Sequence, residues 1–179
     1  MKFYNKIGLY LLVLLIFAGC ASTKVTSRDE IVTGKLPRPA HIWVYDFAAT
    51  PEDVPDESAL AGQHSEHNPP QTAEQIKTGR QLGAEIEAQL VKRIQSMGLP
   101  AEHAVKGTTP QINDLVIRGY LVSYNAGSEA KRILIGFGSG ASDLKVAVEG
   151  FQMTAQGLRK LGSGTTDAEG AKTPGADLG

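Results

Sequence analysis

Three groups of residues in this sequence have the chemistry to act as a site. The chain has one cysteine, Cys20, placed directly after two small residues. Two histidines, His64 and His67, flank a Ser-Glu pair in a proline-rich stretch, and glycines recur at 136, 138 and 140. A thiolate is a nucleophile, imidazole binds transition metals, and a glycine-rich backbone can approach a phosphate. Each group needs a particular element around it to function.

The histidine pair lacks such an element. His64-Ser-Glu-His67 is one residue short of the His-x-x-Glu-His zinc-protease spacing, and Pro69 and Pro70 follow at once, so no helix is predicted to hold the two rings. Incidental binding of a transition metal is the most that this pattern indicates. The sequence therefore predicts no resident metal site.

The glycine segment matches a dinucleotide fingerprint in letters only. Gly136-x-Gly138-x-x-Ala141 follows an apolar stretch, but the fingerprint requires a helix directly behind it. Leu144, Val146 and Val148 instead alternate with other residues at the period of a strand. We therefore expect a kinked or bulged hairpin and no cofactor. This leaves Gly136, Phe137, Gly138 and Gly140 as a candidate interaction segment.

Catalytic patterns are missing elsewhere in the sequence. Serines occur without a Gly-x-Ser-x-Gly elbow, and no pair of carboxylates has a fixed spacing on one predicted element. The sequence predicts no catalytic residue.

Cys20 stands in the best-defined context. Lys2 and Lys6 precede an uncharged apolar run over residues 7–18, which is shorter than the ~20 residues that span a bilayer and is typical of a signal peptide. The run ends in Phe-Ala-Gly-Cys, which resembles the bacterial lipobox, with phenylalanine where leucine is usual. The resemblance implies cleavage after Gly19 and a lipid on Cys20. Ala21, where aspartate would favour the inner membrane, implies sorting to the outer membrane.

Two other interpretations of this end remain open. Residues 1–19 could be a signal peptide with a cysteine only by chance, or an uncleaved anchor in the inner membrane. The lone cysteine also means that no disulfide forms within the chain.

Composition excludes a nucleic-acid-binding role. Removing residues 1–19 leaves 179 − 19 = 160 residues, and 18 − 2 = 16 basic against 19 acidic side chains, a net charge of about −3. A nucleic-acid-binding domain would need a basic face.

The remaining chain predicts one α/β domain over residues 40–166. Residues 20–39 are polar and unpatterned and are expected to be a lipidated tether. Apolar strands are expected at 41–47, 115–124, 133–135 and 144–148, a poorer one within 151–166, and a long loop at 48–71. The tail, residues 167–179, is Gly/Ala/Thr-rich and is expected to be disordered.

The sequence predicts one helix and marks both of its ends. Thr72 and Gln75 form a capping box, and Gly98 and Pro100 end the helix. A buried stripe with spacings of three and four is expected at Ile76, Gly79, Leu82, Gly83, Ile86, Leu90, Ile94 and Met97. We therefore expect one long helix on a mixed or antiparallel sheet of about four strands, with disordered termini.

Five blocks in order resemble an uncharacterised bacterial lipoprotein family, the domain of unknown function 4410. They are residues 43–47 (WVYDF), 79–83 (GRQLG), 115–120 (LVIRGY), 131–140 (KRILIGFGSG) and 172–175 (KTPG). In plan, the chain also resembles the periplasmic domains of envelope-assembly lipoproteins. Those families continue where this chain stops, so we expect either a truncated form or reliance on a partner for cover.

These observations predict a non-catalytic lipoprotein anchored in the outer membrane through Cys20, facing the periplasm, that recruits or supports an envelope protein partner. An envelope enzyme of unrecognised type is the alternative.

Overall fold

The computed structural model of the chain describes residues 23–32, 34–55, 58, 60, 71–124 and 144–168. Cys20, His64, His67 and the 136–140 segment lie outside these residues. Within the described part, no helix is long and apolar enough to cross a membrane.

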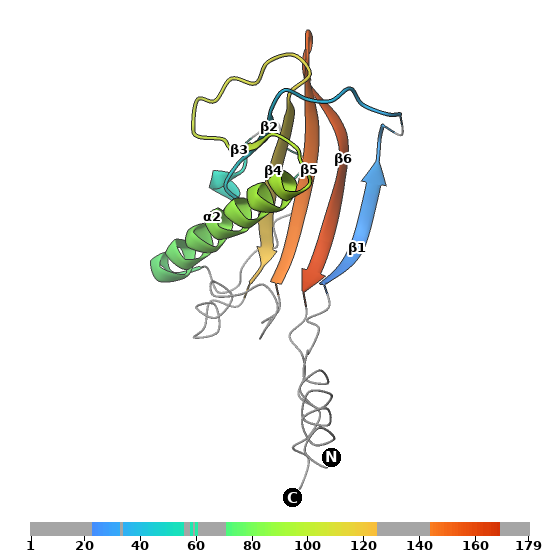
Figure 1. Ribbon diagram of the computed structural model, residues 1–179. Coiled ribbons are helices and arrows are strands. Elements are labelled where there is room, and N and C mark those ends of the chain that lie inside the picture. Colours follow the sequence, from blue (N-terminus) through green and yellow to red (C-terminus); the bar gives the residue numbers. More distant parts are fainter. Residues whose placement is uncertain are drawn as a thin grey trace, which may run out of the picture.

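A six-stranded mixed sheet forms the body of the fold (Figure 1). Its order is β1 (Thr23–Glu30), β6 (Gly157–Ala168), β5 (Leu144–Thr154), β4 (Leu115–Ser123), β2 (Ile42–Val44) and β3 (Ala101–His103). β2 runs parallel to both β3 and β4, whereas β4, β5, β6 and β1 pair antiparallel. The expected α/β class is confirmed coarsely, but the sheet is larger than the four strands predicted.

The long helix α2 (Ala73–Ser96) agrees closely with its prediction. The Thr72 hydroxyl accepts from the Gln75 amide at 3.2 Å, and the Gln75 side chain accepts from the Thr72 amide at 2.7 Å. Gly98, at φ +76°, follows the end of the helix. Lys77 and Gln81 are exposed. Met97 was expected in the buried stripe but is 59% exposed, because it lies just past the last helical residue.

The sheet has different covers on its two faces. α2 packs on β2, β3 and β4 on one side, where the core contains Ile42, Val44, Leu82, Ile86 and Leu121. On the other side, residues after β2 fold back over Tyr120 and Ala147 with a one-turn 3-10 helix, Pro51–Asp53. Part of the stretch expected to be a structureless loop is therefore an ordered cover.

Two strands lie where none was predicted. β1 falls within the expected tether and pairs with β6 by its backbone, while all its described side chains are exposed. β3 has only three residues and lies between the predicted helix and the strand expected at 115–124. β6 also runs to Ala168, past the predicted start of the tail. Backbone pairing does not require apolar side chains, so hydropathy gave no signal for β1.

The strand expected at 41–47 is both shorter and less central. β2 ends at Val44 and lies next to the edge strand β3. Phe47 and Ala48 still join the fold, because the Ala48 amide donates to the Gly119 carbonyl at 2.9 Å and the Leu121 amide donates to the Ala48 carbonyl at 2.9 Å.

Candidate functional site

Two glycines bring α2 against the end of β2. A Cβ on Gly83 would lie 2.0 Å from the Phe47 carbonyl oxygen, and one on Gly79 would lie 2.3 Å from the Tyr124 hydroxyl. The Phe47 amide also donates to the Gly83 carbonyl at 3.3 Å. The helix thus lies close to the sheet, and this places the next turn of α2 beside Asp46.

That turn carries the polar residue that is least expected on this face. Glu87 follows Gly83 by four residues and is only 4% exposed. Its Oε1 has no hydrogen-bond partner. A buried polar atom without a partner costs about 1–3 kcal/mol, so its presence needs an explanation.

Three titratable side chains converge at this place. Asp46 follows β2 by two residues, His103 ends β3, and Glu87 comes from α2. One donor atom of each lies within 4.8 Å of the other two, and His103 Nε2 is 3.4 Å from Asp46 Oδ1. We call these three residues the carboxylate–histidine cluster. It lies at the carboxyl ends of parallel strands, where open α/β sheets bind ligands.

Burial controls the protonation of Glu87. It raises the pKa of the carboxyl group, and the nearby Asp46 carboxylate raises it further, whereas His103 lowers it. The cluster thus pairs one buried, readily protonated carboxyl with an exposed imidazole and an exposed carboxylate. This combination can bind a cation or exchange a proton.

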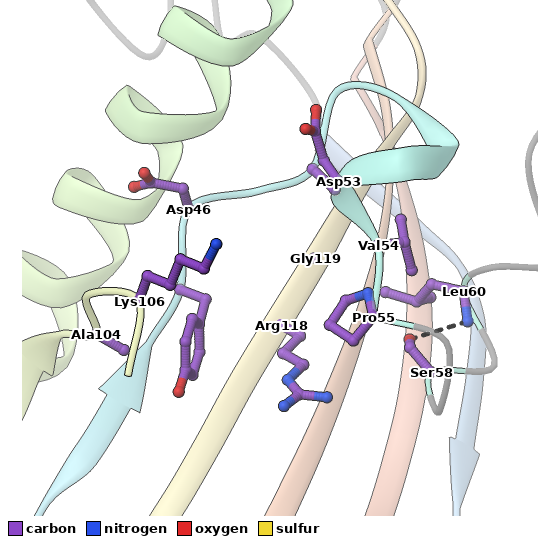
Figure 2. Close-up of a pocket in the computed structure, with 12 residues that line it drawn as sticks. Asp46, Asp53, Val54, Pro55, Ser58, Leu60, Ala104, Lys106, Arg118 and Gly119 are labelled. Carbon is purple, nitrogen blue, oxygen red and sulfur yellow. Dashed lines mark hydrogen bonds between the residues drawn. The ribbon is translucent and has the colours of Figure 1, made fainter. Parts of the chain in front are cut away.

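A cavity of about 240 Å³ adjoins the cluster through Asp46. Figure 2 shows Asp46, Ala104 and Lys106 on one side of it and Val54, Pro55, Ser58 and Leu60 on the other, with Arg118 between. The lining combines small apolar side chains with charges of both signs. Such a cavity can hold a small polar group or a side chain of a partner.

Arg118 on β4 forms part of the wall of this cavity. It is half-buried, with its guanidinium 5.5 Å from the Tyr45 ring centroid and 5.7 Å from that of Phe151. A cation held between aromatic faces is stabilised by their quadrupoles. Its role as part of the cavity wall could not be read from β4 alone, because Phe151 comes from β5 and Tyr45 follows β2.

The wall on the far side of the cavity is fixed by a buried carboxylate. Glu149 on β5 is fully buried and accepts from Lys160 Nζ at 2.7 Å and from the Ser58 hydroxyl. The Leu60 amide donates in turn to the Ser58 hydroxyl at 3.1 Å. Glu149 therefore has a structural role: it holds the cover segment on the sheet.

Asp114 is a second buried carboxylate with a structural role. Its oxygens accept from the His41 amide at 3.1 Å, from Trp43 Nε1 at 3.0 Å and from the Gln111 amide at 2.9 Å. These bonds fix the start of β2 beside the start of β4. Asp114 and Glu149 thus accept hydrogen bonds from named donors, whereas Glu87 Oε1 has no hydrogen-bond partner.

The half of the sheet beyond α2 forms a separate surface. β6 and β1 lie past the helix in Figure 1, and a shallow groove of about 410 Å³ crosses them. Three glycines, Gly150, Gly162 and Gly164, line it together with the charged residues Arg28 and Glu30. We call this the glycine groove.

The sequence and the structure point to different residues. Cys20, Gly136, Phe137, Gly138 and Gly140 lie outside the described residues, so the structure does not place them. The carboxylate–histidine cluster was not predicted. One signal for it was present: Glu87 continues the spacing Gly79, Gly83, then Leu90 and Ile94, so it lies on the buried stripe.

Comparison with known proteins identifies a family. The model of the family "Domain of unknown function (DUF4410)" matches residues 42–177. The chain belongs to this family, as its five sequence blocks predicted.

Other comparisons add little. No curated protein matches the chain. Among solved structures, the chain is similar to a subunit of the PelC dodecamer from Paraburkholderia phytofirmans, with 11% sequence identity, 83% of each chain covered and a TM-score of 0.41.

Proposed function

We propose that this protein is a lipoprotein anchored in the outer membrane through Cys20, facing the periplasm, and that its domain binds an envelope protein partner without catalysing a reaction. One observation carries the proposal: the only cysteine ends a Phe-Ala-Gly-Cys sequence behind a short apolar run with two lysines before it. Small residues there would admit a peptidase, and the thiol would take the lipid. Two or three acyl chains would then make the attachment stable.

The fold gives such an anchor a definite position. β1 begins three residues after Cys20, and three extended residues span at most about 11 Å. Thr23 pairs with Ala168, and Ala168 pairs with Leu144, so these residues share one end of the sheet. A lipid on Cys20 would therefore hold that end close to the membrane surface, instead of letting the domain stand away on a long tether.

The glycine groove is the surface that we assign to the partner. It lies outside the area covered by α2, and Gly150 leaves room for another backbone, since a Cβ there would have no atom within 4 Å. Val148 and Leu161 add apolar area, and Arg28 and Glu30 can orient a polar segment. A flat, partly polar surface of this kind suits a protein segment better than a small molecule.

The anchor is tested with Cys20→Ala in living cells fed a fatty-acid analogue. We expect labelling of the parent protein and of a control variant, Ser22→Ala, and no labelling of Cys20→Ala. Labelling that persists in Cys20→Ala would refute the lipid anchor. An intact mass equal to the unprocessed chain would support an uncleaved inner-membrane anchor instead.

The partner surface is tested by photo-crosslinking in native membranes. A photoreactive residue at Ser163, in the glycine groove, should give an adduct of one defined size, whereas the same residue at Gln81, on the exposed side of α2, should not. Equal crosslinking from both positions would contradict a partner on the groove.

A second function, an envelope enzyme, is favoured by one observation. Burial raises the pKa of Glu87, and this group lies beside His103 and a cavity, as general acids and bases often do. Chromogenic ester, phosphate and peptide substrates can test it. Turnover by the parent that is lost in Glu87→Gln and kept in Gln81→Ala would establish catalysis and refute the non-catalytic proposal.

A further inference from the structure

We propose that Asp46, Glu87 and His103 bind one divalent transition-metal ion, with zinc as the ion that best fits the donors. One imidazole nitrogen and two carboxylate oxygens form a mixed nitrogen–oxygen set, which suits zinc and, less well, manganese. No other group of this kind occurs among the residues that the structure describes. The site does not depend on the lipid anchor or on the partner.

The buried, unpartnered carboxyl of Glu87 distinguishes this cluster from an ordinary group of surface charges. Glu87 is 4% exposed, and its Oε1 has no hydrogen-bond partner, which is costly for a buried polar atom. The buried carboxylates with structural roles, Asp114 and Glu149, both accept hydrogen bonds from named donors. A cation placed between Glu87, Asp46 and His103 would supply the partner that the protein does not.

The distances allow a metal after small side-chain movements. Bonds of about 2.0–2.1 Å in a tetrahedral arrangement place two ligand atoms about 3.3 Å apart. His103 Nε2 and Asp46 Oδ1 already lie 3.4 Å apart, and the widest separation in the cluster is within 4.8 Å. Asp46 and His103 have side chains 55% and 49% exposed, so rotation of these two can close the remaining gap.

The charges also match. Two carboxylates and a neutral imidazole carry a charge of −2, which balances a divalent ion and offsets the desolvation of Glu87. Three protein ligands leave a coordination position open, as in zinc sites that bind water or substrate. Because Asp46 also lines the 240 Å³ cavity, the ion would lie at the edge of that cavity.

The test uses the full chain in detergent, made without a histidine tag and stripped with EDTA. Equilibrium dialysis against Zn²⁺, and separately against Mn²⁺ and Mg²⁺, measures the bound metal by atomic emission. We expect one Zn²⁺ per chain and weaker Mn²⁺ binding. Loss of even an outer-shell group typically costs 10–100-fold, so Glu87→Gln and His103→Ala should each weaken Zn²⁺ binding by at least about 100-fold.

Two controls separate this site from other histidines. His41→Ala removes an exposed imidazole that also contacts a carboxylate, Glu102, at 2.9 Å, yet lies outside the cluster. The double variant His64→Ala/His67→Ala removes the pair in the proline-rich stretch. Both should keep the affinity of the parent.

Several results would overturn the proposal. No saturable Zn²⁺ binding by the parent would do so, as would equal affinity in His103→Ala. Because the His103 side chain is exposed, its replacement should leave the fold intact, so a loss of binding in this variant reports on the site. Loss of Zn²⁺ binding in the His64→Ala/His67→Ala variant would assign the metal site to those two histidines instead. With Co²⁺ as a probe, a thiolate charge-transfer band would implicate Cys20 and exclude a nitrogen–oxygen site. Loss of fatty-acid labelling alone would leave the metal site unaffected.

Discussion

Gly83→Ala tests the contact that positions the cluster. The added Cβ would lie 2.0 Å from the Phe47 oxygen, at least 1.0 Å nearer than the 3.0 Å that real Cβ atoms observe. Phe47 cannot yield easily, because the Tyr45 and Ala48 amides beside it donate to β4 at 3.1 and 2.9 Å. The helix must therefore lift, which loses the bond from the Phe47 amide to Gly83.

For Gly83→Ala, the unfavourable contributions to the free energy of unfolding exceed the favourable one. Alanine in a helix interior gains about 1 kcal/mol over glycine, whereas overpacking costs about 1–3 kcal/mol and the lost hydrogen bond about 0.5–1.5 kcal/mol. We expect Gly83→Ala to lower the free energy of unfolding by about 2 kcal/mol and to weaken metal binding by displacing Glu87. Urea unfolding followed by circular dichroism and by the fluorescence of Trp43 measures the first effect.

Gly150→Ala is the matched control. A Cβ at Gly150 has no atom within 4 Å, so its unfolding free energy should stay within about 0.5 kcal/mol of the parent. If Gly83→Ala were as stable as the parent or more stable, the close approach of α2 to the end of β2 would be wrong. This contact would then not be what brings Glu87 to Asp46.

Three further predictions concern buried residues. Ile86, 8% exposed, faces the sheet, so Ile86→Ala should cost about 2–5 kcal/mol in urea unfolding, and a loss below about 0.5 kcal/mol would show that this side of α2 is not core. Burial raises the pKa of Glu87 above the ordinary 4.5, so the folded state binds this proton more tightly than the unfolded state does. The protonated carboxyl therefore adds to the free energy of unfolding at low pH, and this contribution is lost as the pH rises through the folded-state pKa. In EDTA, Glu87→Gln should therefore be more stable than the parent at neutral pH and equal to it below 4.5, and a pH-independent difference in a urea series would contradict this. Asp114→Ala leaves three donors without their acceptor: the amides of His41 and Gln111 and the indole N–H of Trp43. It should lower the free energy of unfolding by about 3 kcal/mol or more, and Asp114→Asn should lower it by less. Unchanged stability and tryptophan emission in Asp114→Ala would refute the structural role of Asp114.

Local signals in the sequence were sufficient for α2 and β4. The capping box at Thr72, the stop at Gly98 and the apolar stripe each act within a few residues, so they can be read without knowing the rest of the fold. The strand predicted at 115–124 agrees with β4 to within one residue for the same reason. The pairing of β1, by contrast, depends on β6, which lies far along the chain. The polar side chains of β1 do not indicate this pairing.

The cluster depends on three separate elements and has no motif. Asp46 and His103 become neighbours only because β2 and β3 pair in parallel, with Val44 opposite His103. Glu87 was overlooked because a charged residue on a helix is normally assigned to solvent. The sequence did indicate that Glu87 lies in the buried stripe, four residues after Gly83. Its proximity to Asp46 and His103 became apparent only from the position of α2 on the sheet.

The pairing of the first strand with the last constrains how the chain folds. β5 and β6 meet across a tight turn, since Thr154 pairs with Gly157, and this hairpin can form as soon as both strands exist. β1 must instead close a loop of well over one hundred residues, because Thr26 bonds to the carbonyl of Thr165, 139 positions away. Closing so long a loop is slow and has a high entropic cost. During synthesis β1 is made first, yet it can join the sheet only after β6 has formed. Its unpaired backbone therefore stays accessible to chaperones and to mispairing with other strands for almost the whole of folding.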